Sequence, residues 1–183
     1  MSVRDRWINV FYRAATGNKR FRAIVAPLGA VCFFTVLGLL AWLFVSLDRW
    51  LGLPEFLSWP YNVVIAVPIL AIGSLLVVWC NIRFLKAHGT PVPFNPPQEL
   101  VENGPYAVTR NPMLTGMFFV LFGIGALLGS VCLTFLFTPG FILLMTFEVK
   151  YIEEPELEKR LGAPYVEYRR RVPMFFPRFM ART

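Results

Sequence analysis

Long apolar runs, separated by shorter polar segments, organise this chain of 183 residues. Two of the runs, at 23–47 and at about 61–85, are each long enough to form a helix that crosses about 30 Å of membrane hydrocarbon. A third run, 112–149, carries Glu148 as its single charged residue and is too long for one such helix. The pattern therefore predicts a structure dominated by membrane-spanning helices.

The third run predicts a tight hairpin of two helices. Gly129 and Ser130 are turn-forming residues near its middle, so we expect spans at about 112–128 and 131–150. Pro139 should bend the second of these helices. The expected fold class is all-α: an integral membrane helical bundle of about four transmembrane helices, followed by a C-terminal cytoplasmic helical segment.

The polar segments have their own patterns. Residues 4–16 place apolar side chains at helical spacing among arginines, which predicts an amphipathic helix on the membrane surface. The segment 87–111 is rich in proline and too long for a simple connector, so we expect a functional loop. In the tail, Pro155 and Pro164 each suit the first turn of a short helix, and Gly162 suits the end of the first helix.

Composition and cysteine content agree with one membrane domain. Hydrophobic residues make up 56% of the chain and charged residues 16%, which is too little charge for the surface of a soluble domain of this size. The three cysteines all fall in apolar segments, so we expect them to pack rather than to form disulfides or to bind a metal. They are Cys32, Cys80 and Cys132. The domain expected, 1–183, comprises an interfacial N-terminal helix (1–22), a cytoplasmic proline-rich loop (87–111) and a cytoplasmic tail (150–183).

The positive charge is placed on one side of the predicted membrane. Of 18 Lys and Arg residues, only Arg49 falls in a segment expected on the non-cytoplasmic side. This distribution follows the positive-inside rule, so the net charge of +7 indicates topology and contact with anionic lipids rather than nucleic acid. We expect both termini in the cytoplasm, no cleavable signal peptide, and a place in the inner membrane of a prokaryote. The sequence leaves the oligomeric state open.

Two clusters of residues that could bind a ligand or take part in catalysis lie on the predicted cytoplasmic side. One surrounds Arg110 at the start of the third span, and the other is the pair Glu153 and Glu154 beyond the fourth. The hairpin should bring both clusters to one level of the membrane surface, where they could bind a zwitterion. The alternative is that Arg110 binds lipid phosphate and that the glutamates cap a helix.

The stretch Asn103-Gly104-Pro105-Tyr106-Ala107-Val108-Thr109-Arg110-Asn111-Pro112-Met113, the apolar hairpin and Glu153-Glu154 together resemble the isoprenylcysteine carboxyl methyltransferase and phospholipid methyltransferase superfamily. The tail, from Leu161-Gly162-Ala163-Pro164-Tyr165 to Pro177-Arg178, is similar to the C-terminal pattern of that family. The resemblance covers roughly the second half of the chain. Leu114 departs from the family pattern, in which Tyr is frequent at this position, and the departure concerns the lipid-facing side of the pocket.

The resemblance implies a cofactor, S-adenosylmethionine, with S-adenosylhomocysteine as its product. It implies that the tail 150–183 covers this cofactor. The implied cofactor-binding residues are Gly104, Tyr106, Arg110, Asn111, Pro112, Met113, Glu153 and Glu154. Arg110 and Glu153 are also candidate catalytic residues, together with His88, which could serve as a general base or form an interfacial hydrogen bond.

The expected function is transfer of a methyl group to a lipophilic or membrane-delivered acceptor at the cytoplasmic face. A carboxylate or thiolate acceptor needs no base, whereas an amine must first lose a proton, and the sequence does not choose among them. The main alternative is a non-catalytic membrane adaptor or lipid-binding protein. A membrane reductase lacks support from a glycine-rich dinucleotide motif, and a transporter lacks charged residues at mid-membrane depth.

Overall fold

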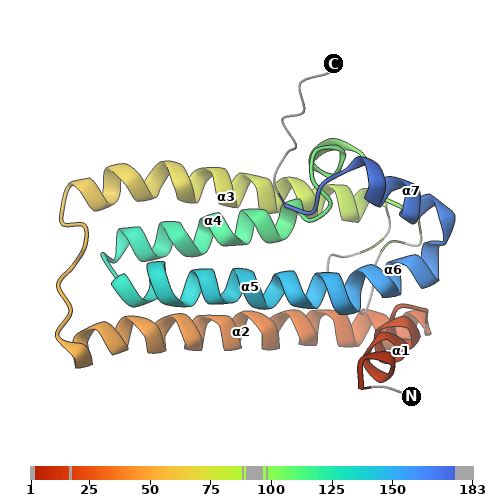
Figure 1. Ribbon diagram of the computed structural model, residues 1–183, viewed down its shortest axis with the longest axis horizontal. Coiled ribbons are helices and arrows are strands. Elements are labelled where there is room, and N and C mark those ends of the chain that lie inside the picture. Colours follow the sequence, from red (N-terminus) through yellow and green to blue (C-terminus); the bar gives the residue numbers. More distant parts are fainter. Residues whose placement is uncertain (1–2, 17, 88, 90–96, 98, 176–183) are drawn as a thin grey trace.

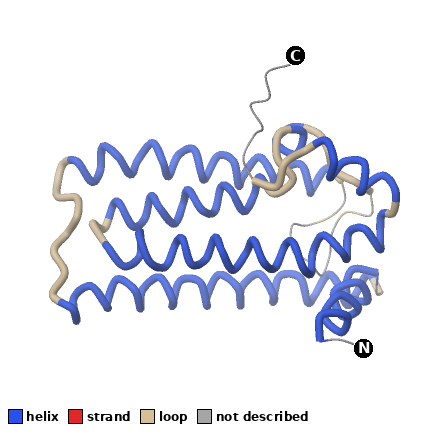
Figure 2. The backbone as a smooth tube through the Cα atoms, viewed as in Figure 1, coloured by secondary structure: helices blue, strands red, loops and turns tan. Residues whose placement is uncertain are grey.

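The computed structural model describes residues 3–16, 18–87, 89, 97 and 99–175, and these residues form a bundle of long helices (Figures 1 and 2). No strand occurs among them. The helices that build the bundle and its N-terminal flank are α1 (Val3–Thr16), α2 (Lys19–Leu51), α3 (Tyr61–Lys86), α4 (Pro112–Leu127) and α5 (Thr138–Glu148). Figure 1 shows α4 and α5 between α3 and α2, so the expected all-α bundle is confirmed.

Three stretches of helix are long and apolar enough to cross a membrane: Pro27–Leu51, Tyr61–Lys86 and Cys132–Leu161. Helix α4 is also apolar but has 16 residues, which corresponds to about 24 Å at the rise of an α-helix. The hairpin between α4 and the next helix turns at Gly129, which has a φ of +60°, as its sequence position predicted.

The last long helix continues further than expected. The predicted span ended at residue 150, but the helix runs without interruption through η2 (Cys132–Phe137), α5, η3 (Val149–Glu153) and α6 (Glu154–Leu161). Both η2 and η3 are π-helical, and each ends two residues before a proline, Pro139 or Pro155. A proline in an α-helix clashes with the carbonyl of the preceding turn, and the wider π turn accommodates it. Only then does Gly162 separate α6 from α7 (Ala163–Arg171), where the short helices were predicted.

Close contact between α3 and α4 depends on glycine. A Cβ atom added at Gly73 would lie 2.7 Å from the carbonyl oxygen of Gly116, and one added at Gly116 would lie 2.9 Å from that of Gly73. The two helices therefore meet backbone to backbone, which is how helices gain packing energy in a membrane, where apolar side chains are not driven together by water.

Helix α2 is attached to the hairpin by a buried carboxylate. The first span was predicted to end at residue 47, but α2 continues to Leu51, so Asp48 lies within the helix. Asp48 accepts hydrogen bonds from the Ser130 hydroxyl and from the Cys132 backbone N–H, the latter at 2.9 Å. Asp48 of α2 thus satisfies a backbone donor at the start of the last long helix. We call this end of the bundle the hairpin end, and the opposite end, where α3 finishes and α4 begins, the site end.

Candidate functional site

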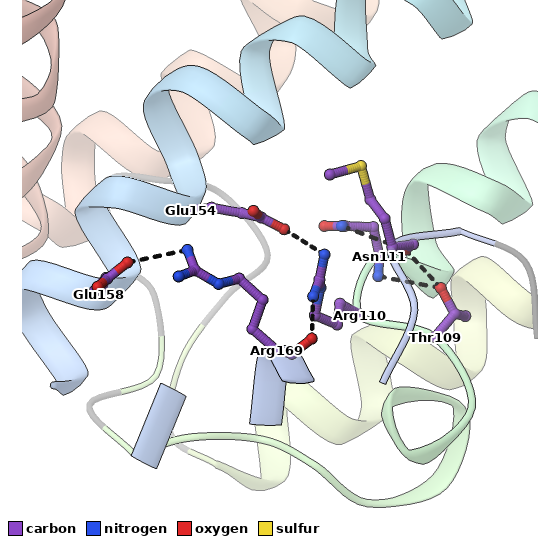
Figure 3. A network of polar contacts seen from close by, with 7 residues as sticks. Thr109, Arg110, Asn111, Glu154, Glu158 and Arg169 are labelled. Carbon is purple, nitrogen blue, oxygen red and sulfur yellow. Dashed lines mark hydrogen bonds and ion pairs between the residues drawn. The ribbon is translucent and has the colours of Figure 1, made fainter. Parts of the chain in front are cut away.

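The segment that enters α4 is held by the C-terminal part of the chain. The backbone N–H of Arg110 donates to the Pro173 carbonyl at 2.8 Å, and that of Asn111 donates to the Met174 carbonyl at 3.0 Å. The Thr109 hydroxyl also donates to Met174 O, at 2.7 Å. Figure 3 labels Thr109, Arg110 and Asn111 of this segment. Residues 173–175, here called the C-terminal strap, therefore fix the backbone of the Arg110–Asn111 segment.

The Arg110 side chain connects three parts of the fold (Figure 3). Its Nη2 lies 2.6 Å from Glu154 Oε1 in a pair whose side chains are 11% and 9% exposed, and its Nη1 donates to the backbone carbonyl of Arg169 at 2.6 Å. Arg169 in turn forms an ion pair with Glu158 at 3.0 Å. Among the residues that the structure describes, the buried Nε of Arg110 has no hydrogen-bond partner.

Tyr106 is held in η1 (Gly104–Ala107), a short 3₁₀ turn that packs against the end of α3. Its ring lies 5.2 Å from that of Phe84, and its backbone carbonyl accepts a hydrogen bond of 2.7 Å from the Tyr168 hydroxyl. Burial raises the pKa of both tyrosine hydroxyls above the usual value, so both stay neutral at physiological pH. Gly104 has a φ of +66° and lies against Arg83, so this turn requires glycine.

A cavity of about 810 Å³ lies at the site end, between α2, α3, η1, the α4 start and the α5–α6 helix. The volume falls in the range of about 300–1000 Å³ that small-molecule sites occupy. One part of its wall is polar and charged, with Asn81, Glu99, Arg110, Asn111, Glu148, Glu153, Glu156 and Arg160. The other part is apolar and includes Phe33, Phe34, Val77, Leu114, Met117 and Met145. A single cavity thus offers contacts to charged groups and to an apolar chain.

The predicted site residues come together around this cavity to different degrees. Five of them line it: Tyr106, Arg110, Asn111, Met113 and Glu153. Gly104 lies in the adjoining turn, Pro112 is buried as the first residue of α4, and Glu154 is the ion-pair partner of Arg110. His88 lies outside the residues that the structure describes. These placements agree with a shared site, and the individual roles stay predictions.

Sequence reasoning assigned no role in the site to several residues that line this cavity. Glu148 was noted only as the single charge of an apolar run. Glu156 and Arg160 fall in the short helix predicted between Pro155 and Gly162. Arg160 pairs with Glu156 at 2.8 Å, with both side chains 8% exposed, and donates to the Pro97 carbonyl. The charge of Glu148 could have indicated a place in the site, because a carboxylate in an apolar span usually faces a cavity.

Comparison with known proteins gives the class to which these features belong. The described residues combine three helical stretches that are long and apolar enough to cross a membrane with a cavity that has charged residues in its wall. A family model described as phospholipid methyltransferase matches residues 61–163, so the chain belongs to the phospholipid methyltransferase family, part of the superfamily that its motifs resemble. It is therefore a member of a family of membrane methyltransferases that use S-adenosylmethionine.

A curated relative is the nickel-cobalt-cadmium resistance protein NccN of Alcaligenes xylosoxydans xylosoxydans, which is 29% identical over 121 residues. The match covers 62% of this chain and 52% of that protein, so the chain spans about half the length of this relative.

The residues around the cavity fit the cofactor of the family. S-adenosylmethionine carries a carboxylate, an ammonium group and a sulfonium. The buried Nε of Arg110, which has no partner within the described part of the chain, is a donor suited to a carboxylate, while Glu153 is an acceptor suited to an ammonium group. Both residues belong to the cavity wall.

Proposed function

We propose that the protein transfers a methyl group from S-adenosylmethionine to a lipophilic acceptor delivered from the membrane. The observation that carries this proposal is the cavity of about 810 Å³ whose wall combines Arg110 and Glu153 with an apolar face. When bound, the cofactor supplies an electrophilic methyl group on its sulfonium. The protein itself would bind the cofactor and the acceptor, orient them toward each other and exclude water.

In this proposal Arg110 binds the cofactor carboxylate through its free Nε, while its Nη1 and Nη2 stay bound to Arg169 and Glu154. Glu153 accepts hydrogen bonds from the cofactor ammonium group. The side chains of Phe33 and Phe34 on α2 and of Met117 on α4 line the apolar face, which would hold the chain of the acceptor.

The site end would face the cytoplasm. It carries Lys86, Arg110, Lys150 and the three arginines 169–171, whereas Arg49 is the basic residue near the hairpin end. The positive-inside rule assigns the basic end to the cytoplasmic side. Both termini would then lie on that side, and membrane lipids would surround α2 and α3.

The test is calorimetric titration of the detergent-solubilised protein with S-adenosylmethionine and S-adenosylhomocysteine. We expect saturable binding of both, and at least about a tenfold loss of affinity in Glu153→Gln, because a charge-assisted hydrogen bond contributes about 1.5–3 kcal/mol. Glu167→Gln, which removes an exposed carboxylate of α7 outside the cavity, should bind as the natural protein does. Absence of binding by folded protein, with lipid added, would refute the proposal and favour a non-catalytic lipid-binding protein.

A further inference from the structure

Helix α1 contacts the part of the chain that carries the site carboxylates, although it lies outside residues 61–163, which the family model matches. Figure 1 shows α1 at the site end beside α6, with its axis turned away from that of α2. It packs against η3 and α6, which contain Glu153 and Glu154. A change in the position of α1 can therefore act directly on the walls of the site.

The side of α1 that faces the protein is polar. The Lys159 ammonium group on α6 donates a hydrogen bond of 2.7 Å to Asn9 and lies 4.4 Å from the centroid of the Tyr12 ring. Both α1 residues are partly buried. An amphipathic helix on a soluble domain turns its apolar side toward the protein. Helix α1 has the reverse orientation.

The other side of α1 is apolar and basic, and it is exposed. Because each residue turns an α-helix by about 100°, Trp7 and Val10 lie on the side away from the contact with Lys159. Their side chains are 52% and 51% exposed. Arg6 and Arg13 are also exposed and neighbour Val10 at helical spacings of four and three residues. We call Arg6, Trp7, Val10 and Arg13 the α1 patch.

The membrane lies within reach of the α1 patch. Helix α1 ends at Thr16 and α2 begins at Lys19, while the apolar span inside α2 begins at Pro27. Lys19 to Pro27 corresponds to about 12 Å of helix, so α1 is held close to the lipid headgroups. Indole and aliphatic side chains enter the boundary between headgroups and hydrocarbon, and arginine is attracted to anionic headgroups. The patch thus combines the two properties that bind a charged bilayer surface.

We propose that the α1 patch binds anionic phospholipid at the bilayer surface, and that this binding holds η3 and α6 in place through Lys159. The arginines select the lipid charge, since one basic residue near an anionic surface raises binding about fivefold. On α6, Arg160 follows Lys159 directly and lines the cavity together with Glu156. The charge of the bilayer would then determine how firmly this wall of the cavity is held. The inference does not require that the cavity bind S-adenosylmethionine.

The experiment compares the purified full-length protein in nanodiscs of phosphatidylcholine alone and of phosphatidylcholine mixed with phosphatidylglycerol. Backbone hydrogen exchange, followed by mass spectrometry, is measured for α1 and for residues 149–161. In the anionic nanodiscs we expect exchange to slow by at least about tenfold in α1 and about threefold in residues 149–161. In the double variant Arg6→Gln with Arg13→Gln, each segment should exchange equally in the two lipids.

Lys159→Met separates lipid binding from its effect on the site. The substitution removes the hydrogen bond to Asn9 but leaves the α1 patch, so α1 should keep its slower exchange in anionic lipid while residues 149–161 lose theirs. Arg49→Gln is the matched control, because Arg49 is an exposed basic residue near the hairpin end. This variant should behave as the natural protein does.

Several outcomes would overturn the inference. Equal exchange of α1 in the two lipids, or a lipid effect that survives loss of both arginines, would show that the α1 patch does not bind anionic lipid. Unchanged exchange of residues 149–161 in the natural protein, or a lipid effect there that survives Lys159→Met, would overturn the connection through Lys159. Absence of cofactor binding would refute the proposed function alone, because hydrogen exchange is measured without the cofactor.

Discussion

At the scale of single residues, Arg110 shows how one side chain can connect a site to its scaffold. Its guanidinium binds the Glu154 carboxylate through one nitrogen and the Arg169 carbonyl through another. The planar fork of arginine holds these donors in a fixed geometry, whereas lysine has a single nitrogen on a flexible stem. A buried ion pair contributes little net stability, because desolvation offsets the attraction. We therefore interpret the pair as fixing the orientation of Arg110 rather than as stabilising the bundle.

Removal of one partner of this pair should lower the free energy of unfolding far more than removal of both partners. Arg110→Met leaves Glu154 buried and unpaired, so we expect a loss of about 3–5 kcal/mol in the free energy of unfolding. The double variant Arg110→Met with Glu154→Leu should recover much of that loss. Unfolding in mixed detergent, monitored by circular dichroism for the two single variants and the double variant, measures the coupling.

The exposed pair of Arg171 and Glu102 provides the control. Its side chains are 62% and 46% exposed and lie 3.0 Å apart, so Arg171→Met should cost about 0–1 kcal/mol. Strictly additive losses at Arg110 and Glu154 would contradict the interpretation of a tightly coupled buried pair.

At the scale of elements, the sequence predicted the helices more reliably than their connections. The spans and the turn at Gly129 followed from hydropathy and from turn-forming residues. The continuation of the last helix to Leu161 did not, because a proline is normally taken as a helix start and the π turns before Pro139 and Pro155 have no hydropathy signal. The clustering of Arg110 with the Glu153–Glu154 pair was anticipated from the hairpin. The pairing of Arg110 with Glu154 was not, since it depends on side-chain directions set by η3.

The contact between α3 and α4 gives a prediction at the same scale. Gly116→Ala should lower the melting temperature, because the new Cβ would meet the Gly73 carbonyl at 2.9 Å and overpacking costs about 1–3 kcal/mol. Gly38 of α2 is the matched control, since nothing lies within 4 Å of a Cβ added there. Gly38→Ala should be neutral or slightly stabilising. Equal melting temperatures for the two variants would show that the helices are free to separate.

At the scale of the whole molecule, the two ends of the bundle differ in character. The hairpin end is closed by the hydrogen bonds of Asp48 to Ser130 and Cys132. At the site end, residues of α2 between Pro27 and Phe34 form part of the cavity wall. In addition α1 lies against α6, where Lys159 donates to Asn9 at 2.7 Å and sits 4.4 Å from the Tyr12 ring centroid. The helix predicted at 4–16 is thus present as α1 and contacts α6, while its position on the membrane surface stays a prediction.

The orientation of the molecule can be tested with a membrane-impermeant maleimide. In a Cys32→Ser background, Glu55→Cys in the loop between α2 and α3 should react in intact spheroplasts, because the hairpin end faces outward in the proposed topology. Glu167→Cys on α7 should react only after the membrane is permeabilised. Labelling of residue 167 in intact spheroplasts would reverse the orientation and place the cavity on the outer side.

The site cannot be complete before the C-terminal strap has been translated. Its carbonyls at Pro173 and Met174 hold the backbone of Arg110 and Asn111, and Phe175 packs against Phe118 of α4 at 5.4 Å between ring centroids. A ribosome completes every membrane-spanning helix before it adds these residues. A nascent chain can therefore be fully inserted in the membrane and still lack a fixed Arg110, so its site takes its final shape only when translation has passed residue 175.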